Sequence, residues 1–107
     1  MKTRMAIAIL SVVTALTATT VFAQGPGAAT YKAKCAMCHA ADGSGATPAG
    51  KAMKTPSFSS PEAMKMSTAE LVAVTKNGKG KMPAYSGKLT GGQITEVVAY
   101  IQTLQKK

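Results

Sequence analysis

The chain has few of the residues that build most metal and nucleic-acid sites. Its 107 residues include two cysteines, one histidine, four acidic residues and no tryptophan. A structural zinc site needs four ligands, usually in two separated pairs, and no second pair exists. With few aromatic residues and no arginine after Arg4, nucleic-acid binding is not expected. Because strand-like alternation and internal repeats are also lacking, the sequence predicts a small all-α protein.

One pentapeptide uses both cysteines and the histidine. Cys35-Ala36-Met37-Cys38-His39 has the form C-x-x-C-H, the attachment motif of c-type haem. Two thiols three positions apart can form thioether bonds with the two vinyl groups of one haem, and the following imidazole can bind its iron. The motif therefore predicts a single covalently attached haem c, with Cys35 and Cys38 as attachment points and His39 as an iron ligand. Ligation by two histidines is excluded.

The C-x-x-C spacing has two other interpretations. A thioredoxin-like redox pair would need a surrounding βαβ pattern, which the sequence does not show. A disulfide between Cys35 and Cys38 would close too short a loop to stabilise the chain much. The histidine directly after Cys38 is what favours haem attachment over both.

Residues 1–23 are predicted to be a secretory signal peptide. Lys2 and Arg4 precede an apolar run, and Ala23 offers a small residue for cleavage, which leaves a mature domain at 24–107. An uncleaved membrane anchor is the alternative, weakened by five Ser and Thr residues between residues 5 and 23. Since haem is attached to such motifs on the far side of the bacterial inner membrane, we expect a periplasmic protein without stable membrane insertion after cleavage.

About four helices are expected in the mature domain. Residues 28–34 are rich in alanine and lysine and lead into the motif. Ser67 and Glu70 form a capping-box pattern before an apolar run, and Thr90 and Gln93 form a second one. The last helix repeats apolar residues at helical spacing up to Leu104. The stretches 42–50, 56–61 and 79–88, rich in Gly or Pro, are predicted to be loops.

Positive charge dominates the mature domain. Eleven lysines but only four acidic residues follow residue 23. The lysines gather in two groups: Lys51 and Lys54, and then Lys76, Lys79, Lys81 and Lys88. These groups form either an ordinary solvated surface or a docking face for redox protein partners with acidic surfaces.

Taken together, these features resemble the class I cytochromes c, especially the small bacterial and cytochrome c6-like members. The resemblance covers about residues 27–104 and rests on C-x-x-C-H, the Gly/Pro loop after it, a late Met-Pro and a closing helix with an aromatic residue. It implies that Gly27, Tyr31 and Tyr100 lie where the first and last helices cross. It also implies that the Pro48 carbonyl accepts a hydrogen bond from the second ring nitrogen of His39.

The resemblance also identifies Met82 as the sixth iron ligand. The segment 81–85, Lys-Met-Pro-Ala-Tyr, is similar to the axial-ligand loop of this family. A thioether sulfur is soft and raises the reduction potential. Met64 and Met66 are the alternative ligands, since both lie in a segment that could approach the haem.

A periplasmic monohaem one-electron carrier with His39 and Met82 on its iron is the function that these features imply. Such a protein is expected to be a monomer and not an enzyme. A haem-based gas-binding or sensor protein with a displaceable sixth ligand is the rival interpretation. A dedicated subunit of a larger redox complex would use the same chemistry, and the sequence does not distinguish it from a free carrier.

Overall fold

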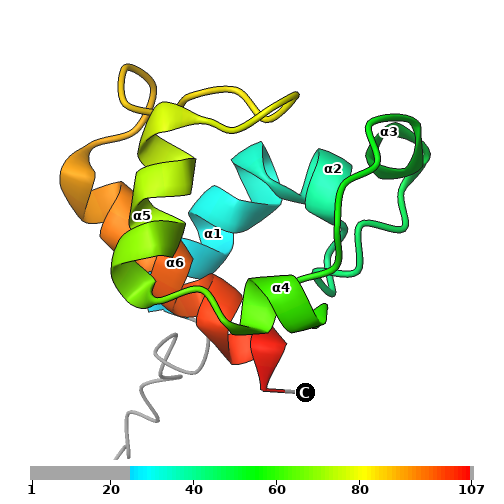
Figure 1. Ribbon diagram of the computed structural model, residues 1–107. Coiled ribbons are helices and arrows are strands. Elements are labelled where there is room, and N and C mark those ends of the chain that lie inside the picture. The colour runs from blue at the N-terminus through cyan, green and yellow to red at the C-terminus, as the bar shows by residue number, and fades with distance from the viewer. Residues whose placement is uncertain (1–24, 107) are drawn as a thin grey trace, which may run out of the picture.

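A computed structural model describes residues 25–106, which form six helices and no β-sheet. The predicted signal peptide, residues 1–23, lies outside the described residues. The all-α prediction is confirmed, and Figure 1 shows the helices arranged around the centre of the domain. None of the described helices is long and apolar enough to span a membrane. The helices are α1 (Gly25–Lys34), α2 (Ala36–His39), α3 (Pro48–Ala52), α4 (Pro61–Met64), α5 (Thr68–Asn77) and α6 (Gly91–Gln105).

Two short helices lie where the sequence predicts loops or irregular chain. In α3 and α4 a hydroxyl residue is the N-cap and a proline is the first helical residue. Thr47 accepts a hydrogen bond from the Gly50 N–H, and Ser60 accepts one from the Ala63 N–H. Proline is favoured at the first helical position because that N–H has no helical partner. The prolines here start helices, and this is why the expected number of about four was too low.

The two predicted capping patterns begin the two longer C-terminal helices. Ser67 accepts from the backbone N–H of Glu70 at the start of α5. Thr90 and Gln93 form a complete capping box, in which each side chain bonds the other residue's backbone. This reciprocal cap lets α6 begin at Gly91 in spite of two successive glycines, which are poor helix formers.

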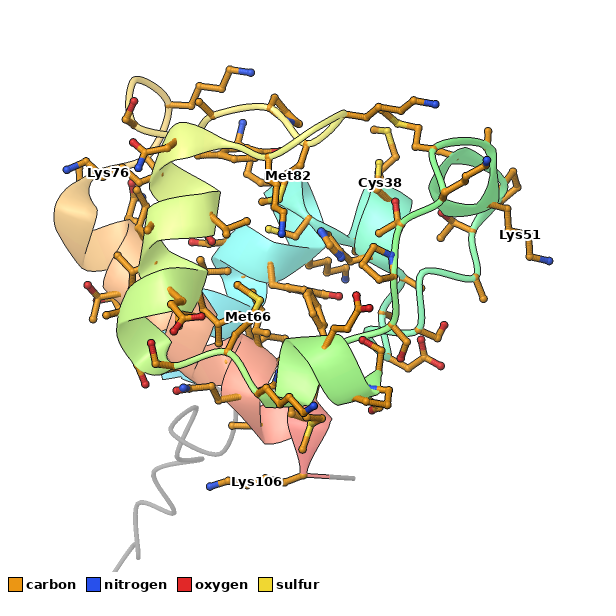
Figure 2. All side chains as sticks on the ribbon, viewed as in Figure 1. Cys38, Lys51, Met66, Lys76, Met82 and Lys106 are labelled. Atoms are coloured by element: carbon orange, nitrogen blue, oxygen red, sulfur yellow. The ribbon has the colours of Figure 1, made fainter. Side chains whose placement is uncertain are left out.

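Between α5 and α6 runs a segment, residues 78–89, that we call the Met82 loop. In the view of Figure 2, Met82 lies between α5 and α2, with Cys38 beyond it. Within this loop only Leu89 is buried, and Met82 and Tyr85 are half-buried. The loop therefore lies mostly at the surface.

The first and last helices cross at close range, as the resemblance to the class I cytochromes c implies. A Cβ atom on Gly27 would lie 2.1 Å from the Glu96 carbonyl oxygen, so only glycine allows this approach. The rings of Tyr31 and Tyr100 lie beside each other, with centroids 5.2 Å apart. This crossing fixes the end of α1, from which the C-x-x-C-H motif continues.

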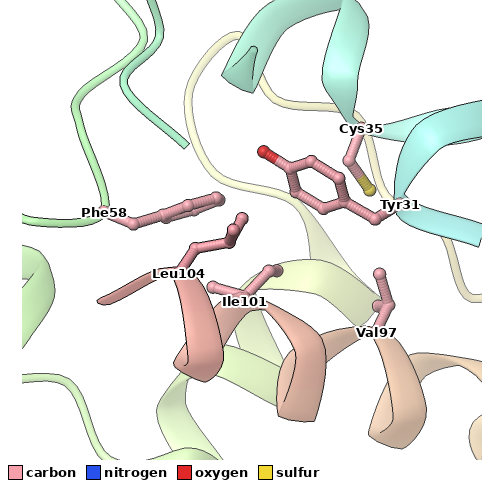
Figure 3. Close-up of a cluster of buried hydrophobic side chains, with 6 residues drawn as sticks. All are labelled: Tyr31, Cys35, Phe58, Val97, Ile101 and Leu104. Carbon is pink, nitrogen blue, oxygen red and sulfur yellow. The ribbon is translucent and has the colours of Figure 1, made fainter. Parts of the chain in front are cut away.

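The buried cluster at this crossing includes the first cysteine of the motif. Figure 3 shows Tyr31 and Cys35 facing the apolar residues of α6, with the Phe58 ring at the side. Val97 is completely buried, and Ile101 and Leu104 are 5% and 4% exposed. The six members are Tyr31, Cys35, Phe58, Val97, Ile101 and Leu104. Cys35 is thus anchored in the hydrophobic core.

Candidate haem site

The C-x-x-C-H segment forms one helical turn directly after α1. Cys35 donates its N–H to the Tyr31 carbonyl and precedes α2 as its N-cap residue. Its own carbonyl accepts the N–H groups of Cys38 and His39, at 3.2 and 2.9 Å. Residues three and four apart in a helical turn lie on the same side. The turn therefore presents both sulfurs and the imidazole to one side, and the two sulfurs are not joined to each other.

The chemical state of Cys35 argues against a thiol redox pair. Its side chain is 9% exposed, and burial raises the pKa of its thiol to about 11. Reactive cysteines of redox motifs have a lowered pKa because the thiolate is the attacking species. The thiol of Cys35, at the first position of C-x-x-C, instead has a raised pKa and stays neutral, which does not suit an attacking cysteine.

His39 is held in the neutral form that binds a metal. Its ring stacks on Phe58 with centroids 4.6 Å apart and 14° between the planes. Burial lowers the pKa of the imidazole, because desolvation disfavours the charged ring. Its Nδ1 atom is buried and has no hydrogen-bond partner. Buried polar atoms are normally paired. Nδ1 is the nitrogen that the resemblance pairs with the Pro48 carbonyl, so the other ring nitrogen, Nε2, is the one that would bind iron.

The segment after the motif is attached to α2 by Thr47, a residue that the sequence analysis missed. Its hydroxyl donates to the Met37 carbonyl at 2.6 Å while it caps α3. A Cβ on Gly50 would lie 2.2 Å from the Cys38 carbonyl oxygen, so the two backbones nearly touch. The pair Thr47-Pro48 could have predicted this role, because a hydroxyl residue followed by proline commonly begins a helix.

Pro48, the predicted partner of His39, is the first residue of α3 and is exposed. The structure places it beside Thr47, one residue from the contact with α2. His39 Nδ1 donates no hydrogen bond to its carbonyl or to any other described group. The role of the Pro48 carbonyl therefore stays a prediction.

Tyr31 supports the chain where it leaves the motif. Ala40 has a φ of +66°, a left-handed conformation that a residue with a Cβ adopts only at a cost. The Tyr31 hydroxyl donates to the Ala40 carbonyl at 2.5 Å. Burial first, and then the nearby Cys35, raise the pKa of Tyr31, which keeps its hydroxyl protonated as a donor. The strained backbone after His39 is thus held by a residue of the core.

Met82 lies in a tight turn that is built by backbone hydrogen bonds. Lys79 and Met82 exchange two of them, N–H to carbonyl in each direction, at 3.1 and 3.0 Å. A Cβ on Gly78 would lie 2.7 Å from the Met82 carbonyl oxygen, and Gly78 has a φ of +77°. The position of Met82 is therefore set by the backbone of its loop.

The alternative ligands Met64 and Met66 lie around the end of α4. Met64 is 51% exposed, whereas Met66 and Met82 are half-buried. In the view of Figure 2, Met82 lies at the level of Cys38 and Met66 lies nearer α4. Among these three, Met82 alone lies on a loop that is hydrogen-bonded to the segment of the motif, through Tyr85 and Lys34.

The donor set fits haem c better than a bare metal ion. It comprises two unjoined sulfurs, a neutral imidazole with an unpaired nitrogen, and a methionine on a neighbouring loop. Within residues 25–106, no group of three or more His, Cys, Asp or Glu side chains is positioned to hold a metal ion. A large ring bonded to both sulfurs would carry the iron away from them, which suits this arrangement.

Comparisons with known proteins place relatives of this chain among the c-type cytochromes. Residues 23–101 match the protein family described as "Cytochrome C oxidase, cbb3-type, subunit III". The chain is 36% identical to cytochrome c6 of Synechococcus sp. (strain ATCC 27167 / PCC 6312), over 94% of this chain and 91% of the relative. It is 41% identical to cytochrome c-555 of Chlorobaculum thiosulfatiphilum, over 70% and 88%.

The same fold occurs in a solved structure. The c-type cytochrome KustC0563 matches 74% of this chain and 96% of its own, with a TM-score of 0.67 and 23% identity. The chain belongs to the class I cytochrome c family and resembles its cytochrome c6-like members. It carries covalently bound haem c with iron. Its single C-x-x-C-H motif makes it a monohaem cytochrome, a class of electron carriers.

Proposed function

We propose that Cys35 and Cys38 hold the haem covalently and that His39 and Met82 bind its iron. When bound, the haem supplies a one-electron redox couple. Phe58 packs on the His39 ring and fixes its plane. The backbone turn from Lys79 to Met82 fixes the other ligand. With His39 and Met82 both on the iron, electron transfer would need little change in geometry.

One observation carries this proposal. The hydroxyl of Tyr85 donates to the carbonyl of Lys34 at 3.0 Å, although the two residues are 51 positions apart. Lys34 directly precedes Cys35, and Tyr85 follows Met82 by three residues. The bond therefore brings the loop of the sixth ligand against the start of the attachment motif.

The optical spectrum of the holoprotein tests the ligand assignment. Wild type should show a weak far-red sulfur-to-iron band when oxidised and no response to carbon monoxide when reduced. Met82→Ala should lose that band and bind carbon monoxide readily. Met66→Ala is the control, since it removes an equally half-buried methionine and should keep the band.

Two results would contradict the assignment. Loss of the band in Met66→Ala, and not in Met82→Ala, would make Met66 the ligand. Ready carbon monoxide binding by wild type would replace the carrier with the gas-binding or sensor function.

The partner that we propose is a redox protein with an acidic docking surface. Residues 71–95 contain no Asp or Glu, and their four lysines are all exposed. Surface charge of one sign speeds encounter with a partner of opposite charge, and salt weakens that effect. These lysines are Lys76, Lys79, Lys81 and Lys88.

Electron transfer to an acidic redox partner should slow as salt rises. Replacement of Lys79 and Lys81 by Gln should flatten this salt dependence. Replacement of Lys32 and Lys106 by Gln is the control with the same loss of charge, outside residues 71–95. Equal flattening by both pairs would show that net charge acts, and not this docking surface.

For location, we propose the periplasm, with residues 1–23 as a cleaved signal peptide. Mass spectrometry of the mature protein tests this, because cleavage after Ala23 gives a chain that begins at Gln24. Gel filtration of the same material tests the expected monomer. It also separates a free carrier from a subunit of a stable redox complex.

A further inference from the structure

Tyr85 joins the Met82 loop to two different helices, α5 and α1. Its N–H donates to the Thr75 carbonyl of α5 at 3.1 Å, and its own carbonyl accepts from Lys88 and Leu89, both at 2.9 Å. Its hydroxyl donates to the Lys34 carbonyl at 3.0 Å. The backbone bonds hold the loop to α5 and to itself. The hydroxyl holds it to a different element, the end of α1.

The Lys34 carbonyl is free to accept this bond because of how the motif turns. The last carbonyls of a helix have no partner within the helix. After α1 ends at Lys34, the N–H groups of Cys38 and His39 both donate to the Cys35 carbonyl, one residue further on. The Lys34 carbonyl therefore accepts no backbone N–H from the motif, and it accepts a hydrogen bond from the Tyr85 hydroxyl.

We propose that Tyr85 is a positioning residue for the sixth iron ligand, acting through its hydrogen bond to Lys34. This inference rests on the proposed ligation by Met82. In the described part of the chain, this is the only hydrogen bond that joins the Met82 loop to residues 25–39. Lys34 is next to Cys35, the first attachment cysteine. The bond therefore fixes the position of the Met82 loop relative to the segment that holds the haem.

The oxidised protein should depend most on this bond. A thioether is a soft ligand and holds ferric iron more weakly than ferrous iron. The oxidised state therefore needs the loop to keep the sulfur in place, and an added ligand such as imidazole can compete for the iron. A more mobile Met82 loop should therefore let imidazole bind the ferric iron more tightly.

Tyr85→Phe removes the hydroxyl and keeps the ring, so the holoprotein should fold. Imidazole should bind the oxidised variant roughly threefold to tenfold more tightly than wild type, as expected for the loss of one hydrogen bond. Its far-red band should weaken, while the spectrum of the reduced protein stays the same. Tyr100→Phe is the matched control, since within residues 25–106 the Tyr100 hydroxyl makes no hydrogen bond, and its imidazole affinity should not change.

Thermal unfolding separates positioning from a purely structural role. If Tyr85→Phe only lowered the melting temperature and left imidazole affinity and the band at wild-type values, the proposal would be overturned. If wild type showed no band, or kept it in Met82→Ala, ligation by Met82 would fail and the positioning role with it. A wild-type band that Met82→Ala abolishes and Tyr85→Phe leaves intact would overturn the positioning role alone.

Discussion

The attachment segment, residues 35–39, and the Met82 loop hold their proposed ligands in different ways. The attachment segment begins at Cys35 in the hydrophobic core, and His39 packs on the buried Phe58. The Met82 loop is mostly exposed and is held by backbone hydrogen bonds and one tyrosine hydroxyl. Apolar burial dominates stability, whereas a single hydrogen bond contributes little net free energy. Substitutions in the attachment segment should therefore unfold the protein or prevent it from holding haem. Substitutions in the Met82 loop should change which group binds the iron as its sixth ligand.

The largest effect is expected at the two cysteines. Cys35→Ala together with Cys38→Ala should abolish covalent haem attachment, because no other thiol exists in the chain. A haem stain on a denaturing gel measures this directly. Met37→Ala, at the 76% exposed position between them, should stain like wild type. Haem retained by the double variant under denaturing conditions would refute the attachment sites.

Gly27→Ala should give the next largest effect and should act on stability alone. The added Cβ would meet the Glu96 carbonyl oxygen at 2.1 Å and force α1 away from α6. We expect a loss of about 2–3 kcal/mol in the free energy of unfolding, measured with denaturant. Gly87→Ala, with no atom within 4 Å of its Cβ, should change it little. An unchanged stability of Gly27→Ala would mean that the crossing is not tight.

Gly78→Ala should weaken the bond between Met82 and the iron and should also lower stability. Its φ of +77° is strained for alanine, and its Cβ would meet the Met82 carbonyl oxygen at 2.7 Å. We expect the far-red band to weaken and the free energy of unfolding to fall by about 1–3 kcal/mol.

Gly80→Ala separates the two causes of this effect. Gly80 also has a positive φ, +57°, but has nothing within 4 Å of its Cβ. Like Gly78→Ala, this variant should lose stability because alanine is strained at a positive φ, but it should keep the far-red band. Equal loss of the band in both variants would show that backbone strain, and not contact with Met82, is the cause.

Acid should weaken the haem-free protein, in which the His39 imidazole is free to titrate, and this is the smallest of these effects. Burial lowers the pKa of this imidazole in the folded protein below the ordinary value of 6.5. Below that value the unfolded chain binds a proton that the folded chain does not, so stability falls as pH falls. Denaturant unfolding between about pH 7.5 and about pH 5.5 should show this decrease. A flat profile would mean that His39 protonates equally in both states.

The sequence predicted what local pattern and short motifs encode. The caps at Ser67 and Thr90 follow from residue types at fixed spacing. The crossing at Gly27 follows from the resemblance to the class I cytochromes c. The short helices α3 and α4 were missed because their prolines indicated loops, although each follows a hydroxyl residue that caps a helix. The bond from Tyr85 to Lys34 joins residues 51 positions apart, and no local pattern predicts such a contact.

The burial of Cys35 has a consequence for biosynthesis. In the folded chain Cys35 is 9% exposed among apolar residues of α6, and burial raises the pKa of its thiol, which makes it a poor nucleophile. A thiol in that state cannot react at a useful rate with a vinyl group. We therefore expect covalent attachment to come before α6 packs on α1, while the chain is still unfolded.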